Sequence, residues 1–274
     1  MFATKDSIGP PLVMGILNCT PDSFSDGGLY SLPEDAATRT LSMFAEGADF
    51  VDIGGESTRP GAIDVDADTQ IARIVPVIEI VSPLLSENQI LSVDTRNADV
   101  AERALSAGAR IVNDVDGGRS ERLLQVVAGF NAGIILTHKQ GNAQTMQDRP
   151  AYQDVVSDVV TDLLERTDKA LQYGVNKDQI AIDPGIGFGK TLEHNVALLQ
   201  NLYRLVETGL PIVLGTSRKS FLKKITAENV PAELVGATGA TTTLATIAGV
   251  RVVRVHDVKE NSQAAKVAYT LFKP

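Results

Sequence analysis

Short apolar runs rich in β-branched residues recur along the whole chain, and each is followed by a turn and then by a helical pattern. Within the runs the apolar residues are continuous rather than alternating, which is typical of parallel strands covered by helices. Eight runs are predicted to be strands, at residues 12–17, 50–53, 90–94, 111–114, 133–137, 180–183, 212–215 and 252–255. Several intervening helices are predicted to end at a glycine, namely Gly47, Gly108, Gly174 and Gly209.

Eight strand–helix units in 274 residues predict an α/β protein with a single (β/α)₈ TIM barrel, a fold that typically takes about 250 residues. The alternative is an open, doubly wound sheet, which gathers its ligands at one switch point. Polar residues instead follow nearly every run, as expected around the mouth of a barrel. No linker, low-complexity tract or shift in composition marks a second domain, so we expect one domain over residues 1–274.

Composition narrows the class of protein further. Hydrophobic residues make up 43% of the chain and charged residues 22%, which excludes general disorder. The formal charge of −9 argues against non-specific binding of nucleic acid. A single cysteine excludes an internal disulfide, and three scattered histidines argue against a zinc centre. With no apolar run near the about 20 residues that cross a membrane, and no signal-peptide pattern, we expect a cytoplasmic protein without a membrane partner.

The most glycine-dense stretch is Asp-Pro-Gly-Ile-Gly-Phe-Gly-Lys-Thr at residues 183–191. It ends like a phosphate-binding P-loop, but Pro184 stands where that motif needs its first glycine, so the P-loop interpretation fails. Two interpretations stay open. Asp183 either caps a helix, or it opens a loop whose glycines let the backbone approach a flat ligand.

Asp94, Asn113 and Asp183 each end or nearly end a predicted strand. Each alone is also typical of a turn residue. Buried carboxylates and amides must be hydrogen-bonded, so three of them around one barrel mouth favour a ligand with N–H groups, such as an amidine-like heterocycle.

Cationic residues follow the last two predicted strands. Lys219 precedes a helix predicted to begin near Ser220, and such a start favours anions. Arg254 and His256 alternate with valines, so they lie on one side of their strand. Barrels commonly bind phosphate at this position. The alternative is a structural ion pair with a neighbouring acid such as Asp257.

Two long polar segments follow the first two predicted strands, at residues 18–28 and 54–61. Long loops in compact domains favour a functional role. Cys19 lies in the first of them, but nothing adjacent supplies a base, so we interpret it as a packing residue.

Taken together, these segments resemble the dihydropteroate synthase family, the folate-pathway enzymes that sulfonamides target. The matching stretches are residues 14–18, 20–28, 52–61, 92–95, 113–114, 183–190, 217–220 and 254–258. They run from the first predicted strand to the last, and their ordered combination is specific. The resemblance implies a TIM barrel, commonly a homodimer, that condenses 4-aminobenzoate with 6-hydroxymethyl-7,8-dihydropterin diphosphate and releases pyrophosphate.

The resemblance also implies roles for individual residues. The pterin ring would bind to Asp94, Asn113, Asp183 and Lys219. The diphosphate would bind to Asn18, Thr58, Arg59, Arg254 and His256. Asn18 would also hold Mg²⁺. The 4-aminobenzoate site would comprise Thr58, Arg59, Pro60, Phe188, Lys219 and Ser220. Catalysis would fall to Asp94, Lys219, Arg254 and His256, with a dissociative, cation-like transition state that Asp94 stabilises.

The chain departs from the family's pattern at two places. The family usually has Met-His-Met after the fifth strand, where this chain has Thr137, His138 and Lys139, and Cys19 replaces an aliphatic residue. Two alternatives share the pterin pocket: a pterin-binding methyltransferase barrel and a non-catalytic pterin-binding protein. Neither would need the cationic elements after the last two strands.

Overall fold

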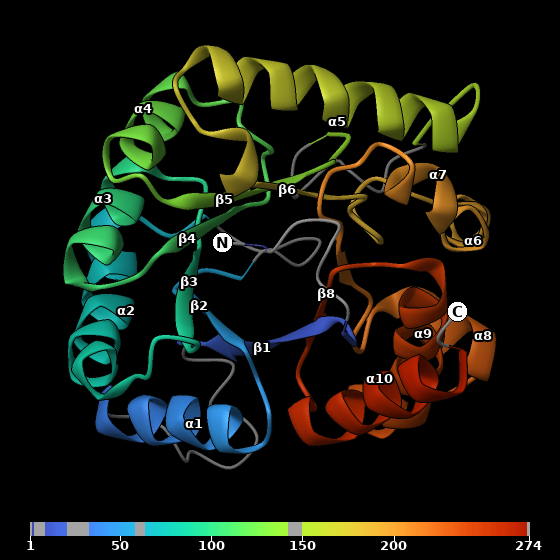
Figure 1. Ribbon diagram of the computed structural model, residues 1–274, viewed down its shortest axis with the longest axis horizontal. Coiled ribbons are helices and arrows are strands. Elements are labelled where there is room, and N and C mark those ends of the chain that lie inside the picture. Colours follow the sequence, from blue (N-terminus) through green and yellow to red (C-terminus); the bar gives the residue numbers. More distant parts are fainter. Residues whose placement is uncertain (1, 3–8, 21–32, 58–63, 142–149, 273–274) are drawn as a thin grey trace.

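The computed structural model describes residues 2, 9–20, 33–57, 64–141 and 150–272, which form a ring of parallel strands surrounded by helices (Figure 1). The strands are β1 (Leu12–Asn18), β2 (Phe50–Gly54), β3 (Ile90–Asp94), β4 (Ile111–Asp114), β5 (Gly133–Thr137), β6 (Ile180–Asp183), β7 (Val213–Gly215) and β8 (Val252–Val255). The helices are α1 (Pro33–Ala45), α2 (Ala67–Val81), α3 (Ala98–Ala107), α4 (Glu121–Gly129), α5 (Val155–Gln172), α6 (Leu192–Gln200), α7 (Leu202–Val206), α8 (Ser220–Thr226), α9 (Val235–Ala248) and α10 (Val258–Phe272).

The sheet closes on itself, which confirms the barrel and excludes the open sheet. Its strand order is β6-β5-β4-β3-β2-β1-β8-β7, and all pairs are parallel. The two ends meet at a parallel bridge between Ile182 and Ile212, where the Ile182 N–H also donates to the Pro211 carbonyl at 3.0 Å. The seventh strand was predicted to begin at Ile212, and this was wrong by one residue because Ile212 forms the closing bridge and β7 begins at Val213.

Apolar side chains fill the end of the barrel at which the strands begin. Met14, Phe50 and their counterparts from the other strands form a buried cluster, and Phe2 packs into it with its ring edge-on to Phe50 at a centroid distance of 6.2 Å. Because this end is packed, polar groups inside the barrel are confined to the opposite mouth.

Local signals place the helices. Polar side chains accept N–H groups of the first turn in α2, α3, α4, α5 and α6, and these N-caps are Asp66, Asn97, Ser120, Asp154 and Thr191. The four glycines predicted to end helices all have positive φ. At Gly108 (φ 121°) a Cβ would also stand 2.6 Å from the Cβ of Ser82, so only glycine fits there.

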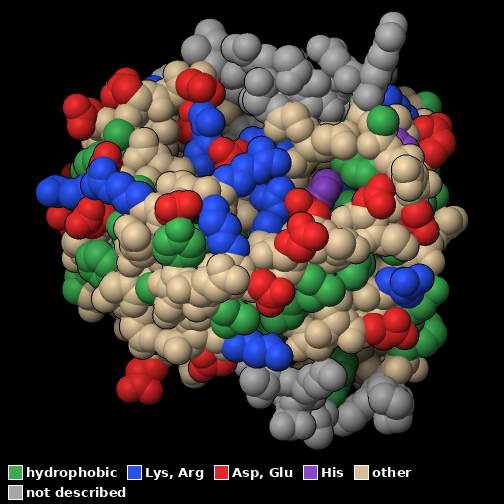
Figure 2. All heavy atoms as spheres, turned by 90° about the horizontal axis from the view of Figure 1, so that it is seen from above, with side chains coloured by type: hydrophobic (Ala, Val, Ile, Leu, Met, Phe, Trp, Pro, Cys, Tyr) green, Lys and Arg blue, Asp and Glu red, His purple; other side chains and the backbone are tan. Residues whose placement is uncertain are grey.

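Lys and Arg side chains gather on the face that carries α5, although the chain is acidic overall (Figure 2). Several of the cationic side chains of α5 contact the loop after β4. Arg166 donates to the carbonyls of Asp116 and Gly117 at 2.7 and 3.0 Å, and Lys169 donates to the carbonyl of Arg119 at 2.8 Å. These cations therefore hold the β4–α4 loop. None of the described helices is long and apolar enough to span a membrane.

Candidate active site

A polar layer lies inside the barrel directly above the apolar one. Its members are inward residues of several strands, and the three predicted strand-end acceptors belong to it. Asp94, Asn113 and Asp183 are all buried, on β3, β4 and β6. Asp114 follows Asn113 but faces the other side of β4, where it accepts the N–H groups of Asp116 and Gly118 and shapes the loop.

Asp52, in the middle of β2, is the centre of this layer and is fully buried. Its Oδ1 accepts from Ser92 Oγ at 2.6 Å, and its Oδ2 accepts from Asn113 Nδ2 at 2.8 Å and Arg254 Nε at 2.7 Å. The bond from Asn113 fixes the orientation of that amide, so its Oδ1 is left as the acceptor. No role for Asp52 was predicted from the sequence. The available signal was a lone acid inside an otherwise apolar strand.

Arg254 joins β8 to both buried carboxylates. Its Nη2 donates to Asp94 Oδ2 at 2.8 Å, while Nε binds Asp52. Burial alone would lower the pKa of Arg254, but the two carboxylates raise it above its usual value. Burial raises the pKa of Asp94 to about 7, with Arg254 opposing the shift. In the part of the chain that the structure describes, Asp94 Oδ1 is the one buried side-chain nitrogen or oxygen without a hydrogen-bond partner.

Asp183 and Lys219 lie on the other side of the mouth. Asp183 Oδ2 and Lys219 Nζ stand 3.8 and 3.9 Å from the position a Cβ would take on Gly215, so both reach the space over that glycine. Lys219 also donates to the Ile186 carbonyl and lies over the Phe188 ring, 4.6 Å from its centroid. Burial lowers the pKa of Lys219 to about 8, and Asp183 opposes the shift. Asp183 accepts the Gly185 N–H at 2.7 Å, so it both shapes the glycine-rich loop and faces the mouth.

The other predicted anion contacts lie around the same mouth. Asn18 ends β1, and its Oδ1 and Asp94 Oδ2 both stand 3.8 Å from the Cβ position of Gly54. His256 follows β8, with Nδ1 3.0 Å from Ser217 Oγ. Asp257 accepts from Arg218 Nε at 3.1 Å. Arg254 does form structural ion pairs, as the alternative proposed, but its partners are Asp52 and Asp94 rather than Asp257.

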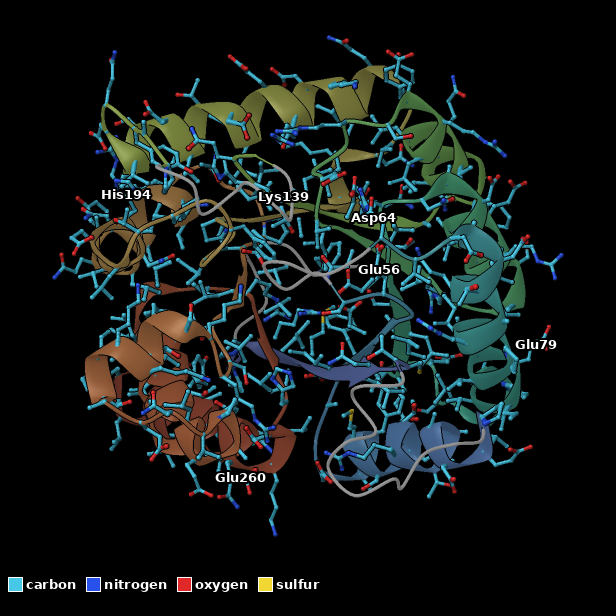
Figure 3. All side chains as sticks on the ribbon, turned by 180° about the vertical axis from the view of Figure 1, so that it is seen from behind. Glu56, Asp64, Glu79, Lys139, His194 and Glu260 are labelled. Atoms are coloured by element: carbon cyan, nitrogen blue, oxygen red, sulfur yellow. The ribbon has the colours of Figure 1, made fainter. Side chains whose placement is uncertain are left out.

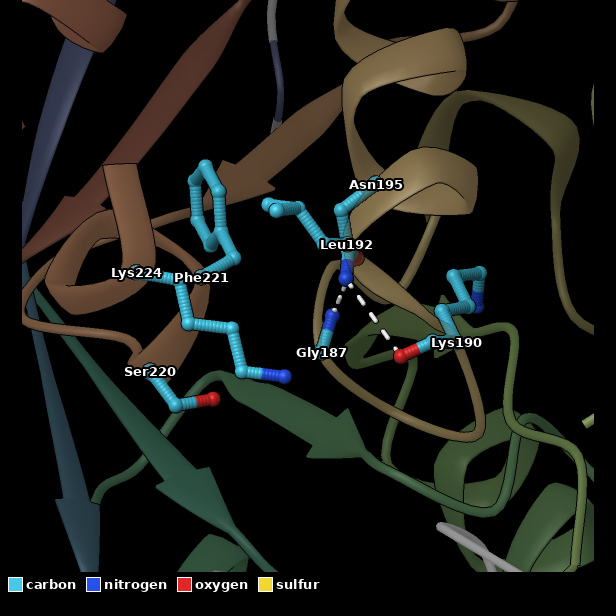
Figure 4. A pocket seen from close by; sticks show the side chains of 7 residues that line it. All are labelled: Gly187, Lys190, Leu192, Asn195, Ser220, Phe221 and Lys224. Carbon is cyan, nitrogen blue, oxygen red and sulfur yellow. Dashed lines mark hydrogen bonds between the residues drawn. The ribbon is translucent and has the colours of Figure 1, made fainter. Parts of the chain in front are cut away.

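The remaining predicted residues divide into two groups. Thr58, Arg59 and Pro60 lie outside the described residues. Ser220 is exposed and begins α8, as predicted. It borders a small pocket of about 30 Å³ between the glycine-rich loop and α8, which Figure 4 shows from close by.

Ion pairs at the rim of the barrel account for Lys139, one of the residues that depart from the family's pattern. The Arg96 guanidinium lies 3.6 Å from Glu56 and 2.8 Å from Asp64, and Lys139 pairs with Asp116. Figure 3 shows Glu56, Asp64 and Lys139 toward the middle of the ring, whereas Glu79 and Glu260 lie at its periphery. Lys139 thus belongs to a rim network and its amine does not join the inner polar layer. Cys19 is buried, and burial raises the pKa of its thiol to about 12, which fits a packing residue.

The donors at the mouth suit Mg²⁺ better than a tightly ligated metal. Among the described residues no group of three or more His, Cys, Asp or Glu could hold a metal ion. Mg²⁺ instead takes one or two protein oxygens and completes its shell with water and phosphate oxygens. Asn18 Oδ1 next to Asp94 offers such oxygens, so the residues present fit Mg²⁺ carried with a diphosphate.

Comparisons with known proteins identify the family of this chain. The family of pterin binding enzymes matches residues 14–256. A dihydropteroate synthase of Mycobacterium leprae is 46% identical over 268 residues, covering 95% of this chain and 93% of its own. The chain belongs to the dihydropteroate synthase family. As a member it is an enzyme, a transferase.

Solved dihydropteroate synthases share the whole fold. The Xanthomonas albilineans enzyme with 4-aminobenzoic acid is 40% identical, with a TM-score of 0.90 over 97% of this chain and 95% of its own. The same enzyme in complex with 7,8-dihydropteroate is 37% identical, with a TM-score of 0.87 over 98% and 96% of the two chains. Similarity of this extent to synthases favours that activity over a methyltransferase barrel or a non-catalytic pterin-binding protein.

Proposed function

We propose that this chain condenses 6-hydroxymethyl-7,8-dihydropterin diphosphate with 4-aminobenzoate to give 7,8-dihydropteroate and pyrophosphate. The observation that carries the proposal is the buried, unpartnered Asp94 Oδ1 within a ring of acceptors. An unpaired buried acceptor costs about 1–3 kcal/mol, which a ligand N–H would recover. A pterin presents several such N–H groups on one edge. The solved relatives that contain 4-aminobenzoic acid, the second substrate, and 7,8-dihydropteroate, the product, support the same reaction.

The inner layer supplies the pterin contacts in this proposal. The carboxylates of Asp94 and Asp183 accept ring N–H groups, and Asn113, held by Asp52, offers its oxygen. Lys219 donates to the carbonyl and N5 edge of the ring. The rings of the pterin and of Phe188 then lie on either side of the Lys219 amine, which is already 4.6 Å from the Phe188 centroid.

In this proposal the diphosphate leaving group binds beside the ends of β8 and β1. Nη1 of Arg254 is available to donate to the diphosphate, since only Nε and Nη2 have hydrogen bonds within the described residues. His256 and Asn18 complete the contacts, together with Thr58 and Arg59 from the segment after β2. Mg²⁺, when bound, neutralises charge on the departing diphosphate.

The substitution breaks the bond between the exocyclic methylene carbon and the diphosphate oxygen, and forms a bond from that carbon to the arylamine nitrogen. Positive charge develops on the methylene and the ring, and anionic Asp94 stabilises it. The arylamine is nucleophilic without a base, and the proton it loses passes to solvent. Phe188, Lys219 and Ser220 would position it, with Thr58, Arg59 and Pro60.

Pyrophosphate release tests the proposal directly. With both substrates and Mg²⁺, we expect pyrophosphate and 7,8-dihydropteroate in equal amounts, measured by a coupled assay and by chromatography. Omitting 4-aminobenzoate should abolish dihydropteroate formation. Failure to form dihydropteroate with both substrates present would refute the proposed function.

A further inference from the structure

Lys190, in the glycine-rich loop, is a buried amine that the proposed chemistry does not use. Its side chain is nearly inaccessible, with a residue exposure of 3%. Nζ lies 2.9 Å from His138 Nδ1 and donates to the carbonyls of Gly185 at 3.0 Å and Phe188 at 3.1 Å. Burial lowers the pKa of Lys190 to about 7, and the Asp183 carboxylate opposes the shift. When protonated, the amine has three N–H donors and no acceptor, so these three partners use it completely.

His138, at the end of β5, is the acceptor on the inner side. Because Nδ1 faces the ammonium, the proton of the neutral ring is on Nε2. Burial, reinforced by the charge of Lys190, lowers the pKa of His138 to about 2, so the ring is neutral in the physiological range. The pair joins the end of β5 to the loop after β6.

Asn195, on α6, holds the same loop from its outer side. Its Oδ1 accepts the Gly187 N–H at 2.7 Å, and its Nδ2 donates to the carbonyls of Lys190 at 3.5 Å and Thr191 at 2.7 Å. Figure 4 shows the bonds to Gly187 and Lys190 across the small pocket. At Gly185 (φ 64°) a Cβ would stand 1.9 Å from the His138 carbonyl, so the loop backbone packs directly on the end of β5.

The loop presents two groups to the reacting side of the mouth. The Ile186 carbonyl accepts from Lys219, and the Phe188 ring lies beneath the same amine. Lys190 binds the carbonyls on either side of this section, those of Gly185 and Phe188. Its ammonium therefore fixes the path of the backbone between them.

We propose that Lys190 is a positioning residue for the arylamine site, and that its ammonium, seated on His138, holds the glycine-rich loop so that Phe188 meets the second substrate. This rests on the proposed function, because Phe188 is assigned to 4-aminobenzoate there. Lys190 acts on the loop's own carbonyls, whereas a P-loop lysine acts on phosphate.

Lys190→Met tests the role, since methionine keeps much of the length but has no N–H donor. We expect the KM for 4-aminobenzoate to rise at least about tenfold, as for the loss of one charged hydrogen bond, with the KM for the pterin diphosphate nearly unchanged. Lys223→Met is the matched control. It removes the same charge from neighbouring α8, where the amine donates to the Asn229 carbonyl at an exposed position, and both KM values should stay unchanged.

A purely structural role would lower the melting temperature and the active fraction of Lys190→Met without separating the two KM values. An unchanged KM for 4-aminobenzoate, or an equal rise in both KM values, would therefore overturn the proposal. If Lys190→Met does not fold, two variants of His138 test the positioning role instead. His138→Asn places an acceptor near Nδ1 and should keep the wild-type KM, whereas His138→Leu should raise it. Equal KM values in the two variants would count against the proposal.

Product formation by the wild-type chain is measured first. Absence of dihydropteroate refutes the proposed function itself. Turnover by the wild-type chain, combined with unchanged KM values in the variants, refutes only the positioning role.

Discussion

Replacing Asp52 with asparagine perturbs the centre of the inner polar layer by a single atom. The carboxylate accepts from Ser92, Asn113 and Arg254 at 2.6–2.8 Å. An asparagine oxygen can still accept from Asn113 and Arg254 while its NH₂ donates to the Ser92 hydroxyl, so the variant chiefly loses the negative charge beside Arg254. A hydrogen bond to a charged group contributes about 1.5–3 kcal/mol, and breaking a buried ion pair costs about 3–5 kcal/mol. Because Arg254 still pairs with Asp94 in the variant, we expect the free energy of unfolding to fall by about 3 kcal/mol, the lower end of that range.

The same substitution should weaken pterin binding at least about tenfold, because a neutral amide oxygen orients Asn113 and Arg254 less strongly than the charged carboxylate does. Urea unfolding followed by circular dichroism measures the first effect, and titration calorimetry with a pterin measures the second. Asp49→Asn is the control at the opposite end of the barrel, where Asp49 Oδ2 accepts the Val13 N–H at 2.8 Å. It should lower stability by about 1 kcal/mol and leave pterin affinity unchanged. Wild-type pterin affinity in Asp52→Asn would refute the idea that Asp52 organises the site.

Three further predictions concern the proposed reaction. Asp183→Asn should weaken pterin binding well over tenfold, since a carboxylate that accepts two N–H bonds becomes an amide that opposes one of them; undiminished affinity by calorimetry would remove Asp183 from the site. Arg254→Ala should damage use of the diphosphate more than binding of the pterin alone, and a chelator should stop turnover; a rate that survives chelation would contradict the Mg²⁺-assisted departure. Turnover should fall as the pH rises through about 8, where Lys219 loses its proton, and Lys219→Arg should move this limb to higher pH. If turnover falls at the same pH in Lys219→Arg as in the wild type, the loss of activity belongs to the titration of another group.

Continuous apolar runs made the strands predictable. Seven of the eight expected runs lie wholly within observed strands, because each run is predominantly apolar, as is typical of a strand buried on both faces. The error at Ile212 came from a backbone contact. Ile212 is as apolar as a strand residue, but its single bridge to Ile182 closes the barrel, and closure depends on register that no local pattern encodes.

Residue type and position also indicated part of the site. Asp94, Asn113 and Asp183 were correctly expected around one mouth because each ends or nearly ends a strand, and parallel strands all end at one mouth. Asp52 was missed because its importance lies in three donors from three other strands. Lys190 was missed because its main partners are backbone carbonyls, which every residue has.

The balance of buried charge connects the fold to the proposed chemistry. When all are ionised, the inner layer holds three carboxylates, of Asp52, Asp94 and Asp183, and two cations, of Lys219 and Arg254, a net charge of −1. Charges in such a site interact more strongly than in water, so a net negative layer favours positive charge developing on the pterin methylene. The same layer repels a diphosphate. We infer that the leaving group enters with a divalent cation, because the protein's own cations are already neutralised by the carboxylates that the pterin needs.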